Sequence, residues 1–238
     1  MSKSQIFIDC FNKIDQSLRF QYDFRRNMSF GEVIKKSSLL NAVVKKYQDV
    51  LIDYGRLRNA IVHQSSGEFV IAEPNDKAVA QIVKICSLIT SPPRVMDTIA
   101  MKNIITIDHD KSIKDAIKLI DRSGFSNIPI FKEGGIIGVA NSKKIFERLA
   151  KEVSEGNDIE KFINEHLITE IEYGQGFDNY YSICDEGLTI DRALDMFYKN
   201  RKLILILITK SGNYLEKPIG LITDKDILDI NHILDNFV

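Results

Sequence analysis

The chain has 238 residues, 44% of them hydrophobic and 27% charged, which is typical of a folded globular protein and excludes a disordered one. The formal net charge of −1 at pH 7 excludes a strongly basic chain, so charge alone gives no reason to expect nucleic acid binding. No apolar run reaches the roughly 18 residues that a membrane-spanning helix needs, and the opening residues lack the apolar core of a signal peptide.

The three cysteines, Cys10, Cys86 and Cys184, stand far apart. Their odd number and wide spacing argue against a disulfide framework, and the four histidines show no spacing typical of a zinc site. We therefore expect a cytoplasmic protein with reduced cysteines, no membrane contact, no bound metal and no required cofactor.

The first 91 residues have the apolar periodicity of an all-helical domain. A first helix is predicted around residues 7–18, and a third is expected to begin at Asn75 and to stop at the prolines of residues 92–93. Between them, Ser37 or Ser38 is expected to cap one long helix that ends before Gly67. Its predicted apolar stripe is Leu40, Val43, Tyr47, Val50, Tyr54, Leu57 and Ile61. The pattern predicts a bundle of three antiparallel helices, in which the first helix can be split.

The rest of the chain contains two similar segments, residues 92–156 and 157–238. Each has the predicted order β-α-β-β-α, and the first helix of each begins at a hydroxyl residue, Ser112 or Thr189, that is expected to cap it. The strands are predicted at residues 104–107, 127–131, 136–140, 180–183, 203–209 and 218–222. The fold class expected is therefore α+β multidomain, an all-α bundle followed by two repeated units.

The two repeats resemble a tandem pair of cystathionine-β-synthase (CBS) domains, also called a Bateman module. The resemblance rests on "SIKDAIKLIDRSGFSNIPIFKEGGIIGVANSKKI" in the first repeat and "PIGLITDKDIL" in the second. The family motif Gly-hydrophobic-x-Thr/Ser-x-x-Asp is complete at residues 220–226. The resemblance implies that the units pack as a pair and bind AMP, ADP, ATP or S-adenosylmethionine as a regulatory ligand.

The motif residues expected at the ligand are Gly220, Thr223, Asp224 and Asp226. Thr223 is expected at the start of the last helix, where its hydroxyl can donate to a phosphate that the helix N-terminus attracts. Asp226 follows within one turn and can accept from a ribose hydroxyl. In the alternative interpretation, Thr223 only caps the helix and Asp226 only complements its dipole.

The first repeat departs from this motif, because Asn141 replaces the threonine and Lys144 replaces the aspartate. Asn141 can still cap a helix and Lys144 can hold a phosphate, but a lysine cannot accept from a ribose. We therefore expect one competent cleft rather than two.

In the helical domain, "LRNAIVH" supplies Arg58, Asn59 and His63. This pattern resembles the HEPN superfamily (higher eukaryotes and prokaryotes nucleotide-binding), many of whose members are metal-independent ribonucleases that act as dimers. On a straight helix Asn59 and His63 share a face, whereas Arg58 and His63 lie roughly 140° apart. A shared site therefore requires a bent helix or a second chain. The alternative is a structural polar network in which Arg58 pairs with an acid such as Asp23 or Asp53.

Together these features predict a HEPN-like helical domain over residues 1–91, with a first CBS unit over 92–156 and a second over 157–238. The function expected is that of a cytoplasmic, homodimeric regulatory protein that binds an adenine nucleotide and signals through the linker at residues 91–94. The alternatives are a ribonuclease with RNA as its partner, gated by the nucleotide, and a scaffold without catalytic activity.

Overall fold

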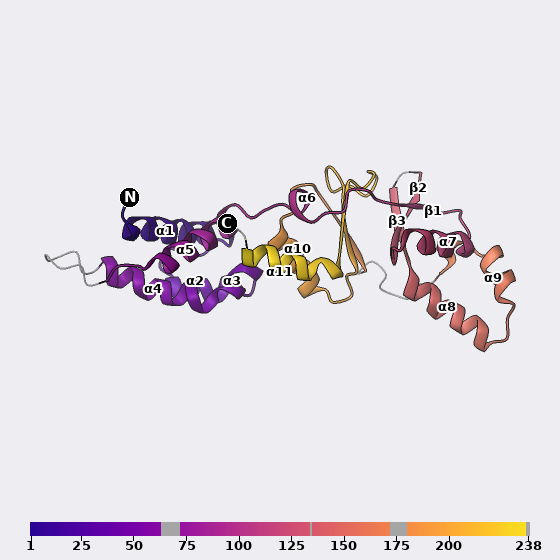
Figure 1. Ribbon diagram of the computed structural model, residues 1–238, viewed down its shortest axis with the longest axis horizontal. Coiled ribbons are helices and arrows are strands. Elements are labelled where there is room, and N and C mark those ends of the chain that lie inside the picture. The colour runs from indigo at the N-terminus through magenta and orange to yellow at the C-terminus, as the bar shows by residue number, and fades with distance from the viewer. Residues whose placement is uncertain (63–71, 134, 172–179, 237–238) are drawn as a thin grey trace. The chain divides into compact units, whose positions relative to one another are not determined.

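The computed structural model describes residues 1–62, 72–133, 135–171 and 180–236, which form a mixed α and β structure (Figure 1). The chain divides into two compact units. The first, called here the helical unit, comprises Met1–Arg94, Thr189–Asp195 and Ile227–Val238. The second, the sheet unit, comprises Val95–Leu188 and Met196–Asp226. The helices of the second repeat are therefore shared between the units, whereas its strands belong to the sheet unit. The predicted domain boundaries remain predictions.

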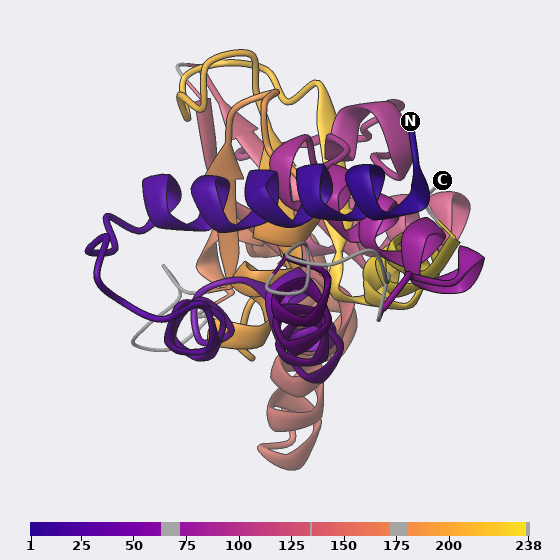
Figure 2. The same cartoon turned by 90° about the vertical axis from the view of Figure 1, so that its left-hand side faces the viewer.

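The N-terminal part of the helical unit is built from α-helices with apolar inner faces. They are α1 (Lys3–Gln21), α2 (Phe30–Ser37), α3 (Ala42–Lys46), α4 (Gln48–Val62) and α5 (Asp76–Thr90). Helix α1 extends across the front of this unit in Figure 2. Its buried residues are the predicted ones, Phe7, Phe11, Ile14 and Leu18. The side chain of Asn75 caps α5 by accepting from the backbone N–H of Ala78 at 2.9 Å, as expected.

The long helix predicted across residues 38–62 is wrong, because the chain forms α3 and α4 with a break at Tyr47. Tyr47 has φ −104° and ψ 16°, outside the helical region, so the helix that follows starts in a new rotational phase. A single apolar stripe with continuous helical spacing therefore cannot predict the buried faces of both α3 and α4. Leu40 is exposed, and the buried residues of α4 are Leu51 and Tyr54.

The predicted cap of this region is also wrong. Ser37 ends α2 and Ser38 follows it, whereas Asn41 caps α3 by accepting from the N–H of Val44 at 3.0 Å. The side-chain amide of Asn41 also donates to the buried carboxylate of Asp191 at 3.3 Å. Asn41 therefore caps its own helix with its side-chain oxygen and binds a residue 150 positions away with its side-chain nitrogen. A serine has only one side-chain polar atom for both contacts.

The sheet unit contains two three-stranded sheets of the same design (Figure 1). The first consists of β1 (Ile107–Asp108), β2 (Asn127–Lys132) and β3 (Gly135–Asn141), and the second of β4 (Tyr181–Cys184), β5 (Leu205–Ile208) and β6 (Gly220–Thr223). In each, the first pair of strands is parallel and the second pair antiparallel. The equal order and directions agree with the repeat seen in the sequence.

Helices follow the strands as the repeat predicts, with additions in the first repeat. They are α6 (Val95–Thr98), α7 (Ile113–Ser123), α8 (Ser142–Ser154), α9 (Ile159–Glu165), α10 (Ile190–Lys199) and α11 (Ile227–Asn236), with 3₁₀ turns η1 (Ile168–Glu170) and η3 (Asp224–Asp226). Ser112 caps α7 in a reciprocal capping box with Asp115, and the hydrogen bonds from Ser112 lower the pKa of that carboxyl. The Thr189 hydroxyl instead donates to Asp191 at 2.5 Å.

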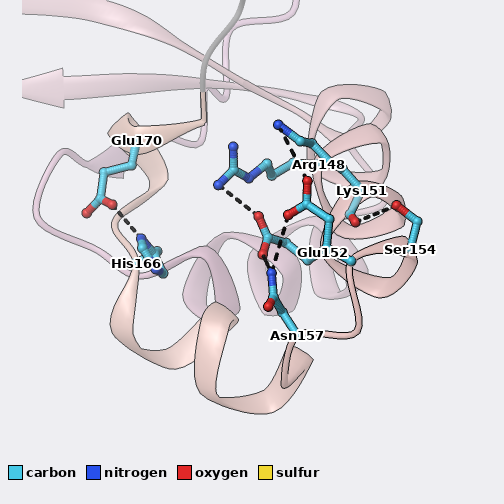
Figure 3. Close-up of polar contacts among 8 residues, drawn as sticks. Arg148, Lys151, Glu152, Ser154, Asn157, His166 and Glu170 are labelled. Carbon is cyan, nitrogen blue, oxygen red and sulfur yellow. Dashed lines mark hydrogen bonds and ion pairs between the residues drawn. The ribbon is translucent and has the colours of Figure 1, made fainter.

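Helix α8 and the unpredicted α9 close the core of the first repeat through a buried ion pair (Figure 3). Glu152 is 5% exposed and accepts from Arg148 at 2.8 Å and from Asn157 at 2.7 Å. The Arg148 guanidinium lies over the ring of Phe162, 5.2 Å from its centroid. Phe162 belongs to the apolar core that includes Ile107, so this network joins the two helices to the sheet.

Candidate functional site

A cleft of about 270 Å³ in the sheet unit brings together residues that are far apart in the sequence. One wall consists of residues 99–105, a second of the turn between α7 and β2, and a third of β6 with η3. Its lining residues are Ile99, Met101, Ile104, Ile105, Gly124, Phe125, Ser126, Asn127, Leu221, Thr223, Lys225 and Asp226. The first two walls belong to the first repeat and the third belongs to the second repeat.

Backbone hydrogen bonds fix the first wall against the third. The N–H of Met101 donates to the carbonyl of Leu221 at 2.9 Å, and the N–H of Leu221 donates back at 3.0 Å. The second wall begins at Gly124, which ends α7 with a φ of 70°, a conformation that glycine adopts without steric cost. Reciprocal bonds and a tight turn therefore hold the apolar side chains around the cleft in place.

Thr223 and Asp226, two of the predicted site residues, both line this cleft. The Oδ2 atom of Asp226 accepts from the backbone N–H of Thr223 at 2.6 Å and from its hydroxyl at 3.1 Å. Asp226 thus provides the acceptor for the backbone N–H of Thr223, which lies just before the last helix. Both side chains are half-buried, so each faces the cleft and supports the local turn.

The other two predicted motif residues do not line the cleft. Gly220 is buried in β6, where the Met96 side chain packs so closely that a Cβ atom on residue 220 would overlap its sulfur. Asp224 is exposed in η3. The structure therefore places Gly220 as a packing position and Asp224 beside the cleft.

The predicted site residues of the first repeat, Asn141 and Lys144, are not among the residues that line the cleft. Asn141 caps α8 by accepting from the N–H of Lys144, and its amide donates to Oδ1 of Asn127 at 2.6 Å. Because Asn127 lines the cleft, Asn141 supports the cleft indirectly. The Lys144 ammonium pairs with Glu147 at 2.8 Å, a hydrogen bond that raises the pKa of the lysine.

The sequence interpretation missed Phe125, Ser126, Asn127 and Lys225 as cleft residues. Lys225 lies inside the motif at residues 220–226, so its position in the sequence could have indicated that it lines the cleft. Asn127 lies opposite Asn141 in the antiparallel pairing of β2 and β3. Pairing the two predicted strands residue by residue would have placed Asn127 beside the predicted site residue Asn141. Among the lining residues, Lys225 and Asp226 are the charged ones, so the cleft has balanced charge and mostly apolar walls.

A second cleft, of about 480 Å³, lies in the helical unit and contains two of the three residues of the Arg-Asn-His pattern. Arg58 donates to the side-chain oxygen of Asn59 at 3.3 Å, and its guanidinium carbon lies 6.0 Å from the centroid of the Phe11 ring. The Nε atom of Arg58 is buried and has no hydrogen-bond partner among the residues that the structure describes. His63 lies outside the residues that the structure describes.

The expected pairing of Arg58 with an acid is wrong for Asp53, because Asp53 pairs with Arg56 at 3.0 Å. Arg58 has Asn59 as its hydrogen-bond partner instead. Consecutive residues on a helix point in different directions. The Arg58 side chain is long enough for its guanidinium to contact the side chain of Asn59 nevertheless. Arg58 and Asn59 therefore meet without any bend in α4.

Within residues 1–62, 72–133, 135–171 and 180–236, no helix is both long and apolar enough to cross a membrane. Within the same ranges, no cluster of three or more His, Cys, Asp or Glu residues is arranged to hold a metal ion.

The chain is similar to known proteins in its CBS-like part. The family model of the CBS domain matches residues 95–151. Inosine-5′-monophosphate dehydrogenase of Thermoplasma acidophilum is 22% identical over 156 residues, 66% of this chain. The chain spans about a quarter, 26%, of the length of that curated relative.

Two solved structures to which the chain is similar are a CBS domain and a CBS domain pair. The CBS domain of a bacterial CNNM/CorC family Mg²⁺ transporter in complex with ATP is 18% identical, with 63% of this chain and 92% of that chain covered and a TM-score of 0.45. A CBS domain pair in complex with 5′-methylthioadenosine and S-adenosyl-L-methionine is 20% identical, with coverages of 59% and 97% and a TM-score of 0.44.

Proposed function

We propose that this chain is a regulatory protein whose two repeats form a CBS pair and bind an adenine nucleotide in the 270 Å³ cleft. The observation that carries the proposal is that Thr223 and Asp226 of the second repeat line a cleft completed by residues 99–105 and 124–127 of the first. The CBS family match of residues 95–151 and the equal topology of the two sheets support it.

The chemistry of the cleft suits each part of such a ligand. Its apolar walls, which include Ile104 and Phe125, offer van der Waals contact to a purine ring. Oδ1 of Asp226 makes no hydrogen bond with the part of the protein that the structure describes, so it is free to accept from a ribose hydroxyl. Lys225 supplies a positive charge for a phosphate or a carboxylate, and the Thr223 hydroxyl can donate to the same group when it releases the Asp226 carboxylate.

Titration calorimetry with AMP, ADP, ATP and S-adenosylmethionine tests this function. We expect at least one of them to bind, and Thr223→Ala and Asp226→Ala each to weaken binding at least tenfold, because a hydrogen bond to a charged group is worth about 1.5–3 kcal/mol. Asp224→Ala is the matched control, since Asp224 has the same charge but lies outside the cleft. The proposal fails if wild-type protein binds none of the four, or if Asp226→Ala binds as tightly as Asp224→Ala.

The helical unit is proposed as a HEPN-like output domain that forms a homodimer in the cytoplasm. A specific observation favours a second function for it, a metal-independent ribonuclease. Arg58 lines a cleft together with Asn12 and Asn59, and the Arg58–Asn59 hydrogen bond orients a cation toward a neighbouring amide. Arg58 would stabilise the charge on a reacting phosphate, and His63 would act as the base for the 2′-hydroxyl.

For the ribonuclease, we expect purified protein to cleave single-stranded RNA in EDTA and Arg58→Ala and His63→Ala each to reduce the rate at least 100-fold. Arg56→Ala is the control, because Arg56 lines the same cleft but pairs with Asp53. Equal activity in all of these proteins would indicate a contaminating nuclease. If the protein neither binds a nucleotide nor cleaves RNA, the remaining alternative is a scaffold.

A further inference from the structure

Helix α11 begins at Ile227, immediately after the cleft residue Asp226, yet it packs within the helical unit. Its ten residues, Ile227–Asn236, belong by sequence to the second repeat, and a self-contained repeat would keep them on its own sheet. The boundary between the two compact units therefore falls between residues 226 and 227, at the edge of the candidate ligand site.

The far end of α11 is fastened to the N-terminal helices by polar contacts. The Lys46 ammonium pairs with the Asp235 carboxylate at 2.6 Å, and this hydrogen bond lowers the pKa of Asp235. The Tyr47 hydroxyl donates to the carbonyl of Leu234 at 3.2 Å, and the Lys84 ammonium donates to the carbonyl of Asp235. These partners come from α3, from the break between α3 and α4, and from α5.

Apolar burial adds to this attachment. Ile230 is fully buried and Leu234 is 1% exposed, and the two residues lie four positions apart on one face of α11. Leu228, on a different face, is 79% exposed. One side of α11 is therefore buried along its length, whereas the side that carries Leu228 is exposed.

The near end of α11 depends on the cleft. The Asp226 carboxylate accepts both the N–H and the hydroxyl of Thr223, which closes the turn that leads into the helix. A ligand that bonds to Asp226 or Thr223 competes with these bonds or reinforces them. It thereby changes the stability of the turn from which α11 starts.

We infer that α11 is the element through which occupancy of the cleft regulates the helical unit, with the Thr223–Asp226 turn as its input and the contacts of Leu234 and Asp235 as its output. This inference rests on the proposed nucleotide binding for its physiological signal. It replaces the linker at residues 91–94 as the main route. By linkage, whatever changes the packing of α11 in the helical unit also changes the affinity of the cleft for its ligand.

Hydrogen–deuterium exchange on the full chain tests the inference, read in peptides that cover Ala42–Lys46 and Asp76–Thr90. In Asp226→Ala we expect exchange in these peptides to be at least twice as fast as in wild type, because the turn before α11 loses its acceptor. Asp226→Asn is a milder second variant in case the alanine protein does not fold. Asp224→Ala is the control and is expected to exchange like wild type. Saturating AMP, ADP, ATP and S-adenosylmethionine, each added separately to wild type, provide the ligand arm.

Faster exchange in the Asp226 variants, together with faster or slower exchange on addition of a ligand that binds, supports the inference and the proposed function. Faster exchange in the variants when none of the four compounds binds supports the α11 link and overturns nucleotide sensing. A compound can also bind at the cleft while hydrogen exchange in both peptides stays unchanged, both in the variants and on addition of the compound. That outcome overturns the α11 link and leaves nucleotide binding intact. No binding and no effect of the variants overturns both.

Discussion

Replacing Gly135 by alanine is expected to lower the free energy of unfolding by about 3 kcal/mol. Gly135 begins β3 with a φ of 142°, which L side chains rarely adopt. A Cβ atom there would overlap the backbone carbonyl of Tyr214 and lie 2.9 Å from its carbonyl carbon. The carbonyl of Tyr214 also accepts from the N–H of Ile136 at 3.0 Å, so it cannot move away without losing that bond.

Urea unfolding followed by circular dichroism measures this loss, with Gly124→Ala as the matched control. Gly124 also has a positive φ, 70°, but within the described part of the chain no atom beyond its sequence neighbours lies within 4 Å of the position that its Cβ would take. We expect the control to cost about 1 kcal/mol, which is the backbone strain alone. If the two variants are equally stable, the close approach of residues 135 and 214 is not a determinant of the fold.

The second large effect is expected for Glu152→Ala, at about 2 kcal/mol of unfolding free energy. Removing Glu152 leaves Arg148 without its acceptor and Asn157 with only a longer contact to Glu155 at 3.4 Å, and Arg148 is only one third exposed, at 33%. The loss is smaller than for a fully buried pair because water reaches the guanidinium. We also expect α9 to loosen, because the Arg148 guanidinium lies over Phe162 of that helix.

Glu155→Ala is the matched control for Glu152→Ala. Glu155 is exposed, pairs with Lys151 at 3.9 Å and accepts from Asn157 at 3.4 Å, and such surface contacts are worth no more than about 0.5 kcal/mol. The measurement is again chemical unfolding, combined with hydrogen exchange in residues 159–165. A loss below about 0.5 kcal/mol for Glu152→Ala would show that the network in Figure 3 does not hold α8 and α9 together.

The parts of the fold that follow from short-range rules could be predicted from the sequence. The capping box of Ser112 with Asp115 and the cap at Asn75 each need residues within one helical turn. The strand order of the two repeats follows from alternating apolar runs and turn residues. The caps at Ser112 and Asn75 appeared where they were expected because the interacting groups are close in the chain, whereas the first strand, predicted at residues 104–107, forms at Ile107–Asp108.

The helical region was harder to predict because apolar spacing does not show where a helix is interrupted. The stripe through Leu40 and Tyr47 continued across the break between α3 and α4. Asn41 caps α3 locally, but its second contact, with Asp191 of the second repeat, joins residues 150 positions apart. A local pattern contains no information about such a partner.

The sequence by itself determined the repeat and the helix caps at Ser112 and Asn75, since each cap depends on residues a few positions apart. It also placed Thr223 and Asp226 three positions apart as a pair of expected ligand residues. Only the tertiary structure decided that residues 99–105 and 124–127 complete a cleft around that pair, and that α11 belongs to the helical unit. The physical reason is that both outcomes depend on contacts such as Met101 with Leu221 and Lys46 with Asp235. Residues so far apart in the chain meet only when the folded chain buries the apolar faces around them.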